Sequence, residues 1–254
     1  MLIKTIQWNI GGGKIRKVGD SAEGPYNEDG MGHIENILKK YNVDIATFQE
    51  THADDKNVQA EIIAKNIGLP YITNDVYDKS HIEEGQGLGQ AIISRFPISE
   101  HDFKLFLNPH FEVVRPDGKT WISHDKGVSK CLVTIEKGKT AQVSTLHLIP
   151  FRKFGIEPLE EKFENLRTNI ADLASPSNNA FILQGDFNFD DASLKQFLPD
   201  LLSQNISEVL LDEPTTPRGG KYDHVVFRGL THVRSKVIAD VLTDHFPVYS
   251  EFEI

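Results

Sequence analysis

The sequence predicts an α/β protein in which helices and strands are mixed along one chain. The chain opens with a strand–helix–strand–helix pattern, residues 71–148 read as strands without a long helix between them, and the last third returns to a helix before closing strands. No repeat or linker-like segment divides the 254 residues. We therefore expect a single domain spanning residues 1–254, which is long enough to bury a substantial core.

The opening pattern rests on hydrophobic periodicity. Residues 2–8 (LIKTIQW) and 43–49 (VDIATFQ) read as strands. Between them, apolar side chains recur at helical spacing from Met31 to Tyr41. A second helix is expected to begin near Asp54 and to end at Gly68, because glycine commonly terminates helices.

The remaining elements follow from the same signals. A long helix is expected to begin at Pro158, since proline suits the first helical position and apolar residues recur at helical spacing up to Leu173. A weaker helix is expected over residues 193–203. Further strands are expected at residues 71–76, 88–94, 99–107, 128–136, 140–148, 180–184, 222–227, 231–240 and 246–252. The irregular segments 11–30, 77–87 and 108–126 are candidates for loops around a site.

Composition excludes several classes of protein. Hydrophobic residues at 39% and charged residues at 25% are typical of a folded globular protein, and no apolar run is long enough to span a membrane. The single cysteine, Cys131, cannot form an intramolecular disulfide, and the N-terminus lacks the pattern of a signal peptide, so we expect a cytoplasmic protein. The net charge of −10 disfavours a module that grips nucleic acid mainly through phosphates, although bound cations would supply local positive charge.

Polar side chains capable of binding metal or phosphate stand where several apolar strands end. They are Asn9, Glu50, His147, Asp186 and Asn188, with Asp244 and His245 in a loop just before the last strand. Taken singly, each of these residues fits a turn or a surface position better than a site, and His147 fits a core position equally well. Together they converge at one sheet edge, and the carboxylates of Glu50, Asp186 and Asp244 favour Mg²⁺ or Mn²⁺ over zinc.

Seven motifs in order carry a resemblance to a known family. They are QWN (7–9), FQE (48–50), AIISRFPI (91–98), STLHL (144–148), ILQGDFN (182–188), YDHVVF (222–227) and LTDHFPV (242–248). In these motifs and in their order, the chain resembles the endonuclease/exonuclease/phosphatase superfamily of metal-dependent phosphoesterases. The resemblance implies a four-layer α/β/β/α sandwich, in which two mixed β-sheets pack face to face, helices flank them, and the site lies at one end.

The resemblance also implies a role for each matching residue. Glu50 resembles the principal metal ligand of the family, and Asn9 and Asp244 resemble direct or water-mediated ligands beside it. His245 resembles the catalytic histidine, and Asp223 resembles the aspartate that hydrogen-bonds it.

The other three motif residues would surround the phosphorus. Asp186 and Asn188 resemble the pair that orients the attacking water and binds a phosphate oxygen, and His147 resembles the histidine that stabilises the non-bridging oxygens. The implied cofactor is Mg²⁺ or Mn²⁺, and no obligate protein partner is expected.

The function expected from these residues is divalent-metal-dependent phosphoester hydrolysis by in-line attack of an activated water. A phosphodiesterase or nuclease, with nucleic acid as one possible substrate, is the leading hypothesis. A phosphomonoesterase acting on a small phosphorylated metabolite or lipid head group is the alternative. An AP endonuclease is disfavoured because these enzymes carry tyrosine at the position of His147. A non-catalytic binding domain is disfavoured because no motif residue is missing.

Two basic segments near the motifs leave alternatives open. The run GGGKIRK after Asn9 would either embrace a second phosphate or form a mobile loop. The run FRKF at residues 151–154 would either line the rim of a substrate site or pack its aromatic rings under the following helix.

Overall fold

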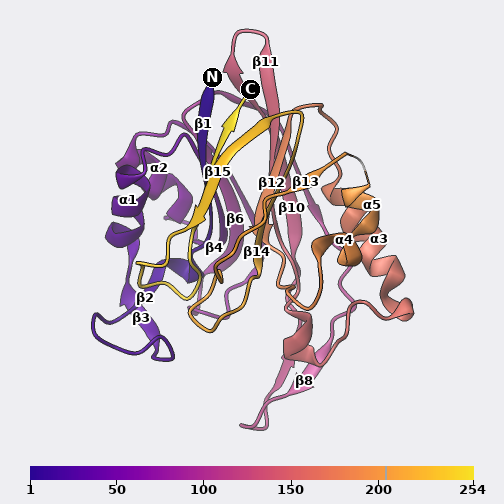
Figure 1. The fold of residues 1–254 in the computed structure, drawn as a ribbon. Helices are drawn as coiled ribbons and strands as arrows, with labels where there is room; N and C mark the ends of the chain where they lie inside the picture. Colours follow the sequence, from indigo (N-terminus) through magenta and orange to yellow (C-terminus); the bar gives the residue numbers. More distant parts are fainter. Residues whose placement is uncertain (204) are drawn as a thin grey trace.

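The computed structural model describes residues 1–203 and 205–254 and contains two six-stranded mixed sheets packed face to face. The first sheet has the order β15 (Thr231–Val237), β16 (Val248–Glu253), β1 (Leu2–Asn9), β4 (Ile45–Ala53), β6 (Gly87–Ser94), β5 (Tyr71–Lys79). The second has the order β13 (Ser207–Glu208), β14 (Asp223–Arg228), β12 (Phe181–Asp186), β11 (Lys139–His147), β10 (Gly127–Glu136), β7 (Ile98–Leu105). With helices on both outer faces, the predicted four-layer sandwich is confirmed (Figure 1).

The helices lie outside the sheets (Figure 1). On the first sheet lie α1 (Met31–Lys40) and α2 (Gln59–Ile67), and beside the second lie α3 (Glu164–Ala174), α4 (Leu194–Phe197) and α5 (Pro199–Leu202). Helix α1 buries Ile34, Ile37 and Leu38, which stand at helical spacing, against Trp8 and other outward-facing residues of the first sheet. Helix α3 buries Leu166 and Ile170 in a separate core on the second sheet.

One parallel strand pair occurs in each sheet. Strands β1 and β4 are parallel in the first sheet, β11 and β12 are parallel in the second, and the other pairs are antiparallel. The two termini meet at one end of the sandwich, where the amino group of Met1 lies 3.2 Å from the carbonyl oxygen of Ile254 (Figure 1). The carboxyl ends of both parallel pairs therefore point to the opposite end.

The layer between the sheets changes from apolar to polar along each strand. In β12, alternate residues facing the other sheet are Ile182, Gln184 and Asp186, and in β11 they are Val143, Thr145 and His147. Gln184 crosses between the sheets: its amide nitrogen donates to the carbonyl of Ile6 and its amide oxygen accepts from Thr5. The polar side chains between the sheets therefore continue to the end of the sandwich where the motif residues lie.

Two helix predictions were wrong in their boundaries. The α-helix expected from Pro158 begins instead at Glu164, because Glu160 is extended and Arg167 takes up the carbonyls of Pro158 and Glu160 with its guanidinium group. The helix expected to begin near Asp54 begins at Gln59.

Other segments differ from the sequence prediction in their regularity. The helix expected at residues 193–203 is broken at Leu198, since the residue before a proline disfavours the helical conformation. The loops expected at residues 11–30 and 108–126 contain the short hairpins β2 (Lys14–Arg16)–β3 (Tyr26–Asp29) and β8 (Glu112–Val114)–β9 (Thr120–Ile122).

Among the described residues, no helix combines the length and the apolar character needed to cross a bilayer.

Candidate active site

Three neighbouring strands of the second sheet place three predicted site residues in one row. His147 ends β11 and pairs with Asp186, which ends β12, and Asp186 pairs in turn with Asp223, which begins β14. Nε2 of His147 lies 3.4 Å from Oδ2 of Asp186. Strand register alone therefore brings together three residues that lie far apart in the chain.

Glu50 reaches the site from the first sheet through a β-bulge. The sequence placed Glu50 at the end of a strand, but β4 continues to Ala53 and the register shifts between Gln49 and Thr51. Glu50 has a φ of 55°, a left-handed conformation that is costly for a residue with a side chain. The bulge turns the carboxylate toward the second sheet, where Oε1 lies 3.8 Å from Nε2 of His147.

Asp186 accepts hydrogen bonds on both of its carboxylate oxygens. Oδ2 accepts from the side-chain amide of Asn9 at 3.0 Å, and Oδ1 accepts from the backbone amide of Asn188 at 2.9 Å. The Asn188 side chain donates to the carbonyl of Leu148 and the residue has a φ of 48°. Burial nevertheless raises the pKa of Asp186 to about 6, although the positive charge of His245 opposes the shift.

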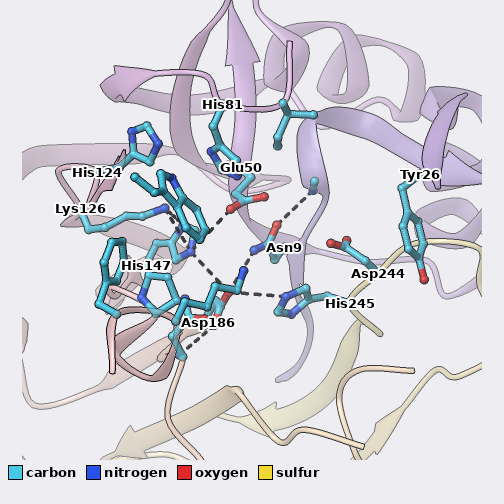
Figure 2. Close-up of a pocket in the computed structure, with 17 residues that line it drawn as sticks. Asn9, Tyr26, Glu50, His81, His124, Lys126, His147, Asp186, Asp244 and His245 are labelled. Atoms are coloured by element: carbon cyan, nitrogen blue, oxygen red, sulfur yellow. Dashed lines mark hydrogen bonds and ion pairs between the residues drawn. The ribbon is translucent and has the colours of Figure 1, made fainter. Parts of the chain in front are cut away.

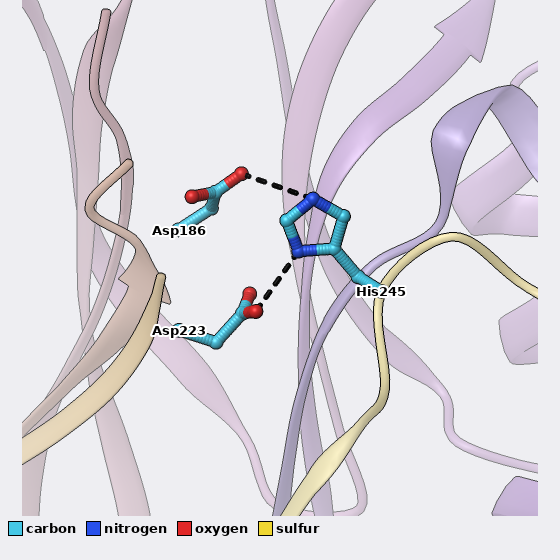
Figure 3. Close-up of side chains that lie close together, drawn as sticks. All are labelled: Asp186, Asp223 and His245. Atoms are coloured by element: carbon cyan, nitrogen blue, oxygen red, sulfur yellow. Dashed lines mark hydrogen bonds and ion pairs between the residues drawn. The ribbon is translucent and has the colours of Figure 1, made fainter. Parts of the chain in front are cut away.

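Asp223 fixes the orientation of the His245 ring through a hydrogen bond (Figure 3). Nδ1 of His245 lies 2.9 Å from Oδ2 of Asp223, and Nε2 lies 3.7 Å from Oδ2 of Asp186. Burial by itself lowers the pKa of His245, but the carboxylates of Asp223 and Asp186 outweigh burial and raise this pKa well above its ordinary value. The backbone amide of Asp223 donates a hydrogen bond to Oγ1 of Thr215. The backbone carbonyl of Thr215 accepts a hydrogen bond from the amide of Phe246, the residue after His245.

Seven of the eight predicted site residues line one cavity of about 240 Å³ (Figure 2). They are Asn9, Glu50, His147, Asp186, Asn188, Asp244 and His245. Asp223, the eighth residue, is buried behind His245 and does not line this cavity. A second cavity of about 260 Å³ shares six lining residues with the first: Tyr26, Pro150, Lys153, Asn188, Asp244 and His245. We call these cavities the first lobe and the second lobe of the cleft.

The donor set fits a hard divalent cation. Oδ1 of Asp244 is buried and has no hydrogen-bond partner among the described residues. Burial raises the pKa of Asp244, and the nearby carboxylate of Glu50 adds to this shift, so two acids share a poorly solvated space. A cation would remove this repulsion, and the carboxylate and amide oxygens of Glu50, Asp244 and Asn9 are suitable ligands.

Asp186, Asp223 and His245 also lie close enough together to surround an ion. Their ligand atoms, however, already face one another, because His245 bridges the two carboxylates. This cluster therefore fits a hydrogen-bonded triad that holds His245 in place better than a metal centre.

Sequence reasoning did not single out several residues that line the first lobe or contact His147. Five of them are Tyr77, His81, Trp121, His124 and Lys126. All five lie in the segments 77–87 and 108–126, which were expected to be loops around a site, and no motif marks them. The hydroxyl of Tyr77 lies 3.0 Å from Nδ1 of His147, and Nζ of Lys126 lies at the same distance from that atom. Burial lowers the pKa of Lys126 to about 8 and, with the charge of Lys126, lowers the pKa of His147 well below its ordinary value.

The glycine run after Asn9 forms a buried turn, and Gly11 lines the first lobe. Gly11, Gly12 and Gly13 all have positive φ values, and a side chain on Gly12 would collide with the ring of His52. Lys14 forms an ion pair of 2.6 Å with Glu83. The three glycines therefore allow the chain to turn in the narrow space between the cavity and the ring of His52.

The second basic segment, residues 151–154, is divided between the core and the cleft. Phe151 is buried in the core of the second sheet, whereas Phe154 and Lys153 line the first lobe. Arg152 lines the second lobe and is paired with Asp191.

Solved structures share this fold. An endonuclease/exonuclease/phosphatase from Beutenbergia cavernae DSM 12333 has a TM-score of 0.77 and 14% identity, with 100% of this chain and 72% of that chain covered. TDP2 from D. rerio, complexed with a single-strand DNA product, has a TM-score of 0.63 and 14% identity, with 100% and 99% covered. A mannosyl-6-phosphatase from Bacteroides thetaiotaomicron VPI-5482 has a TM-score of 0.62 and 19% identity, with 99% and 100% covered.

No curated protein matches the sequence at a significant level. Residues 6–245, which include every predicted site residue, match the model of the Endonuclease/Exonuclease/phosphatase family. The chain therefore belongs to this family, whose members are metal-dependent phosphoester hydrolases.

Proposed function

We propose that this protein is a phosphodiesterase that depends on Mg²⁺ or Mn²⁺. The observation that carries the proposal is the shape of the cleft: two lobes of about 240 and 260 Å³ meet along six shared residues, which include Asn188, Asp244 and His245. A phosphodiester has one substituent on each side of its phosphorus. A phosphate at the junction would therefore place one substituent in each lobe, whereas a monoester needs only one.

Glu50, Asp244 and Asn9 would hold the metal ion. When bound, the ion supplies positive charge to the phosphoryl oxygens and to the leaving oxygen. The buried Oδ1 of Asp244, which has no partner among the described residues, supports this assignment. The site residues and their roles remain predictions that the experiments below test.

The chain's own residues perform the remaining steps of an in-line attack by water. Asp186 accepts a proton from the attacking water, since its pKa of about 6 lies closer to neutrality than that of an ordinary aspartate. Asn9 and the amide of Asn188 hold its carboxylate in place. His245, kept protonated by Asp223, donates a hydrogen bond to a phosphoryl oxygen.

The lining of the lobes indicates which substituents they accept. The first lobe is walled by the rings of His81, Trp121, His124 and Phe154, the second by the ring of Tyr222, and Tyr26 lines both lobes. Such rings stack on planar groups, including nucleobases, without reading their sequence. The net charge of −10 argues against a long nucleic acid duplex as the substrate. A short single-stranded nucleic acid or a small diester with a ring on each side fits better.

Two structural neighbours bear on this choice. TDP2 from D. rerio was solved with a single-strand DNA product, which is consistent with a nucleic acid substrate. The Bacteroides thetaiotaomicron protein is a mannosyl-6-phosphatase, so this fold also serves monoesters. For that reason monoester hydrolysis is the outcome that competes most directly with the proposal. The single thiol of Cys131, which is buried, supports a reducing cytoplasmic setting.

Parallel assays separate the two activities. Hydrolysis of bis-p-nitrophenyl phosphate, p-nitrophenyl phosphate and a short single-stranded oligonucleotide is measured with Mg²⁺, with Mn²⁺ and with EDTA. Metal-dependent cleavage with a higher kcat/KM for the diesters supports the proposal. A higher kcat/KM for the monoester would replace it with phosphomonoesterase activity.

Substitutions in each lobe test the two-sided binding. Trp121→Ala and Tyr222→Ala should each raise KM for bis-p-nitrophenyl phosphate by roughly tenfold, because each removes a stacking surface. In a monoesterase only one of the two substitutions would affect KM. Equal KM values for both variants and the wild type would contradict the placement of one substituent in each lobe.

A further inference from the structure

Lys126 is a buried ammonium group that lines the site and forms no ion pair with the described residues. The residue precedes β10 and is only 4% exposed, yet no carboxylate among the described residues lies within ion-pair distance of Nζ. Its Nζ lies 3.0 and 3.3 Å from the two ring nitrogens of His147 (Figure 2). It also lies over the face of the Tyr77 ring, 5.0 Å from the centroid. Burying an ammonium in this way is costly unless a ligand compensates it.

The backbone holds Lys126 firmly in this position. Its carbonyl accepts a hydrogen bond of 2.9 Å from the amide of Phe106, and the next residue, Gly127, pairs with Leu105. A side chain on Gly127 would come 2.5 Å from the carbonyl oxygen of Lys104, so only glycine permits the two strands to approach this closely. The lysine is therefore placed by the sheet and not by a loose loop.

The ammonium group of Lys126 has more hydrogen-bond donors than its neighbours have acceptors for it. An ammonium group has three N–H donors and no acceptor, and Nδ1 of His147 is already approached by the hydroxyl of Tyr77. Lys126 lines the first lobe together with His147, Glu50 and Asp186, and the charges of these two carboxylates act on its ammonium group. A phosphoryl oxygen bound in this lobe would accept a hydrogen bond from a remaining donor.

We propose that Lys126 binds a non-bridging oxygen of the scissile phosphate directly, as a further catalytic residue beside His147. This inference rests on the proposed function, since it assumes that a phosphate occupies the junction of the lobes. Lys126 then supplies the positive charge on this side of the phosphorus, and Tyr77 with Lys126 fixes the ring of His147 with its Nδ1 as acceptor.

Binding of inorganic phosphate tests the contact without any turnover. Calorimetric titration of the Mg²⁺-loaded protein with inorganic phosphate should show affinity weakened by roughly 10- to 100-fold in Lys126→Met, the usual loss for a hydrogen bond between charged groups. Lys126→Arg should recover part of this affinity. Lys130→Met is the matched control, because that lysine lies on β10 and donates to the carbonyl of Ser175, outside the cleft. Unchanged phosphate affinity in Lys126→Met would overturn the inference.

Thermal stability and a double-mutant cycle separate contact with phosphate from support of the fold. Lys126→Met should keep or raise the Tm of the wild type, because it replaces a buried, unpaired charge. Lys126→Met should still weaken phosphate binding in a His147→Gln background. If its effect vanished there, Lys126 would act only through His147 and the direct contact would be wrong.

Kinetics distinguish this inference from the proposed function. In an active enzyme Lys126→Met should lower kcat for bis-p-nitrophenyl phosphate by about 10²- to 10³-fold. A wild-type protein that hydrolyses none of the esters, yet loses phosphate affinity in Lys126→Met, would refute the phosphodiesterase proposal and support the phosphate contact.

Discussion

Asp223 and His245 are joined by a hydrogen bond of 2.9 Å between Oδ2 and Nδ1. The other carboxylate oxygen of Asp223 accepts from the side-chain amide nitrogen Nε2 of Gln7 at 2.9 Å, so the carboxylate is fixed from both sides. Nδ1 of His245 is therefore the donor to Asp223, and Nε2 faces Asp186 and the cavity. The link crosses the two sheets, since Gln7 belongs to β1 and Asp223 to β14.

Asp223→Asn should lower kcat for the diester by about 10²- to 10⁴-fold while leaving the fold intact. The amide is nearly the same size as the carboxylate but lacks the negative charge that keeps His245 protonated. Nitrogen-15 NMR of the histidine ring should show the loss of the imidazolium form near neutral pH. Full activity in a variant with a neutral His245 would remove this histidine from the catalytic set.

Asp244→Asn should weaken binding of Mn²⁺, measured by calorimetry, by at least about tenfold, because it replaces one of the carboxylates assigned to the metal. In EDTA the same variant should keep or raise the Tm of the wild type. The reason is that burial raises the pKa of Asp244, so its charged form is unfavourable without a cation. Glu136→Gln, a change at an exposed position, serves as the control. Equal Mn²⁺ affinity in Asp244→Asn and the wild type would refute the ligand assignment.

His224 should make stability depend on pH through its contact with Glu208. Burial alone lowers the pKa of His224, but the carboxylate of Glu208, 2.8 Å from Nδ1, raises it above the ordinary value of 6.5. This stabilisation is fully present below pH 6.5 and is lost as pH rises through the higher folded-state pKa.

Glu208→Gln should therefore lower the free energy of unfolding by about 1–3 kcal/mol at pH 6 and by less at pH 9. Urea denaturation of both proteins at the two pH values measures the difference. A loss that grew toward pH 9 would show that His224 is not the group responsible.

Gln184→Leu should lower the free energy of unfolding by about 2–4 kcal/mol, because it leaves buried groups of both sheets without partners. Those groups are the carbonyl of Ile6 and the hydroxyls of Thr5 and Thr47. Asn66→Leu is the control, since that amide forms an exposed hydrogen bond with Glu35 and its loss should cost below about 0.5 kcal/mol. Comparable stability of the two variants would mean that the polar layer between the sheets contributes little.

Sequence and structure agree where a local pattern determines the outcome. The strand expected at residues 180–184 corresponds to β12, and apolar spacing predicts the buried face of α1. The family motifs added the layer order of the sandwich, which hydrophobic periodicity cannot provide because it does not state which sheet a strand joins. Helix boundaries failed at Pro158, where the guanidinium of Arg167 takes up the carbonyls of the preceding segment.

The sequence by itself determined the fold class and the eight residues that the family motifs mark, seven of which line one cavity. Only the tertiary structure decided that Glu50 reaches this cavity from a bulge within β4, and that Tyr77 and Lys126 contact His147. The physical reason is that these features depend on how two sheets pack on each other. Packing brings together residues with no common spacing in the chain, so no motif or period can record their contact.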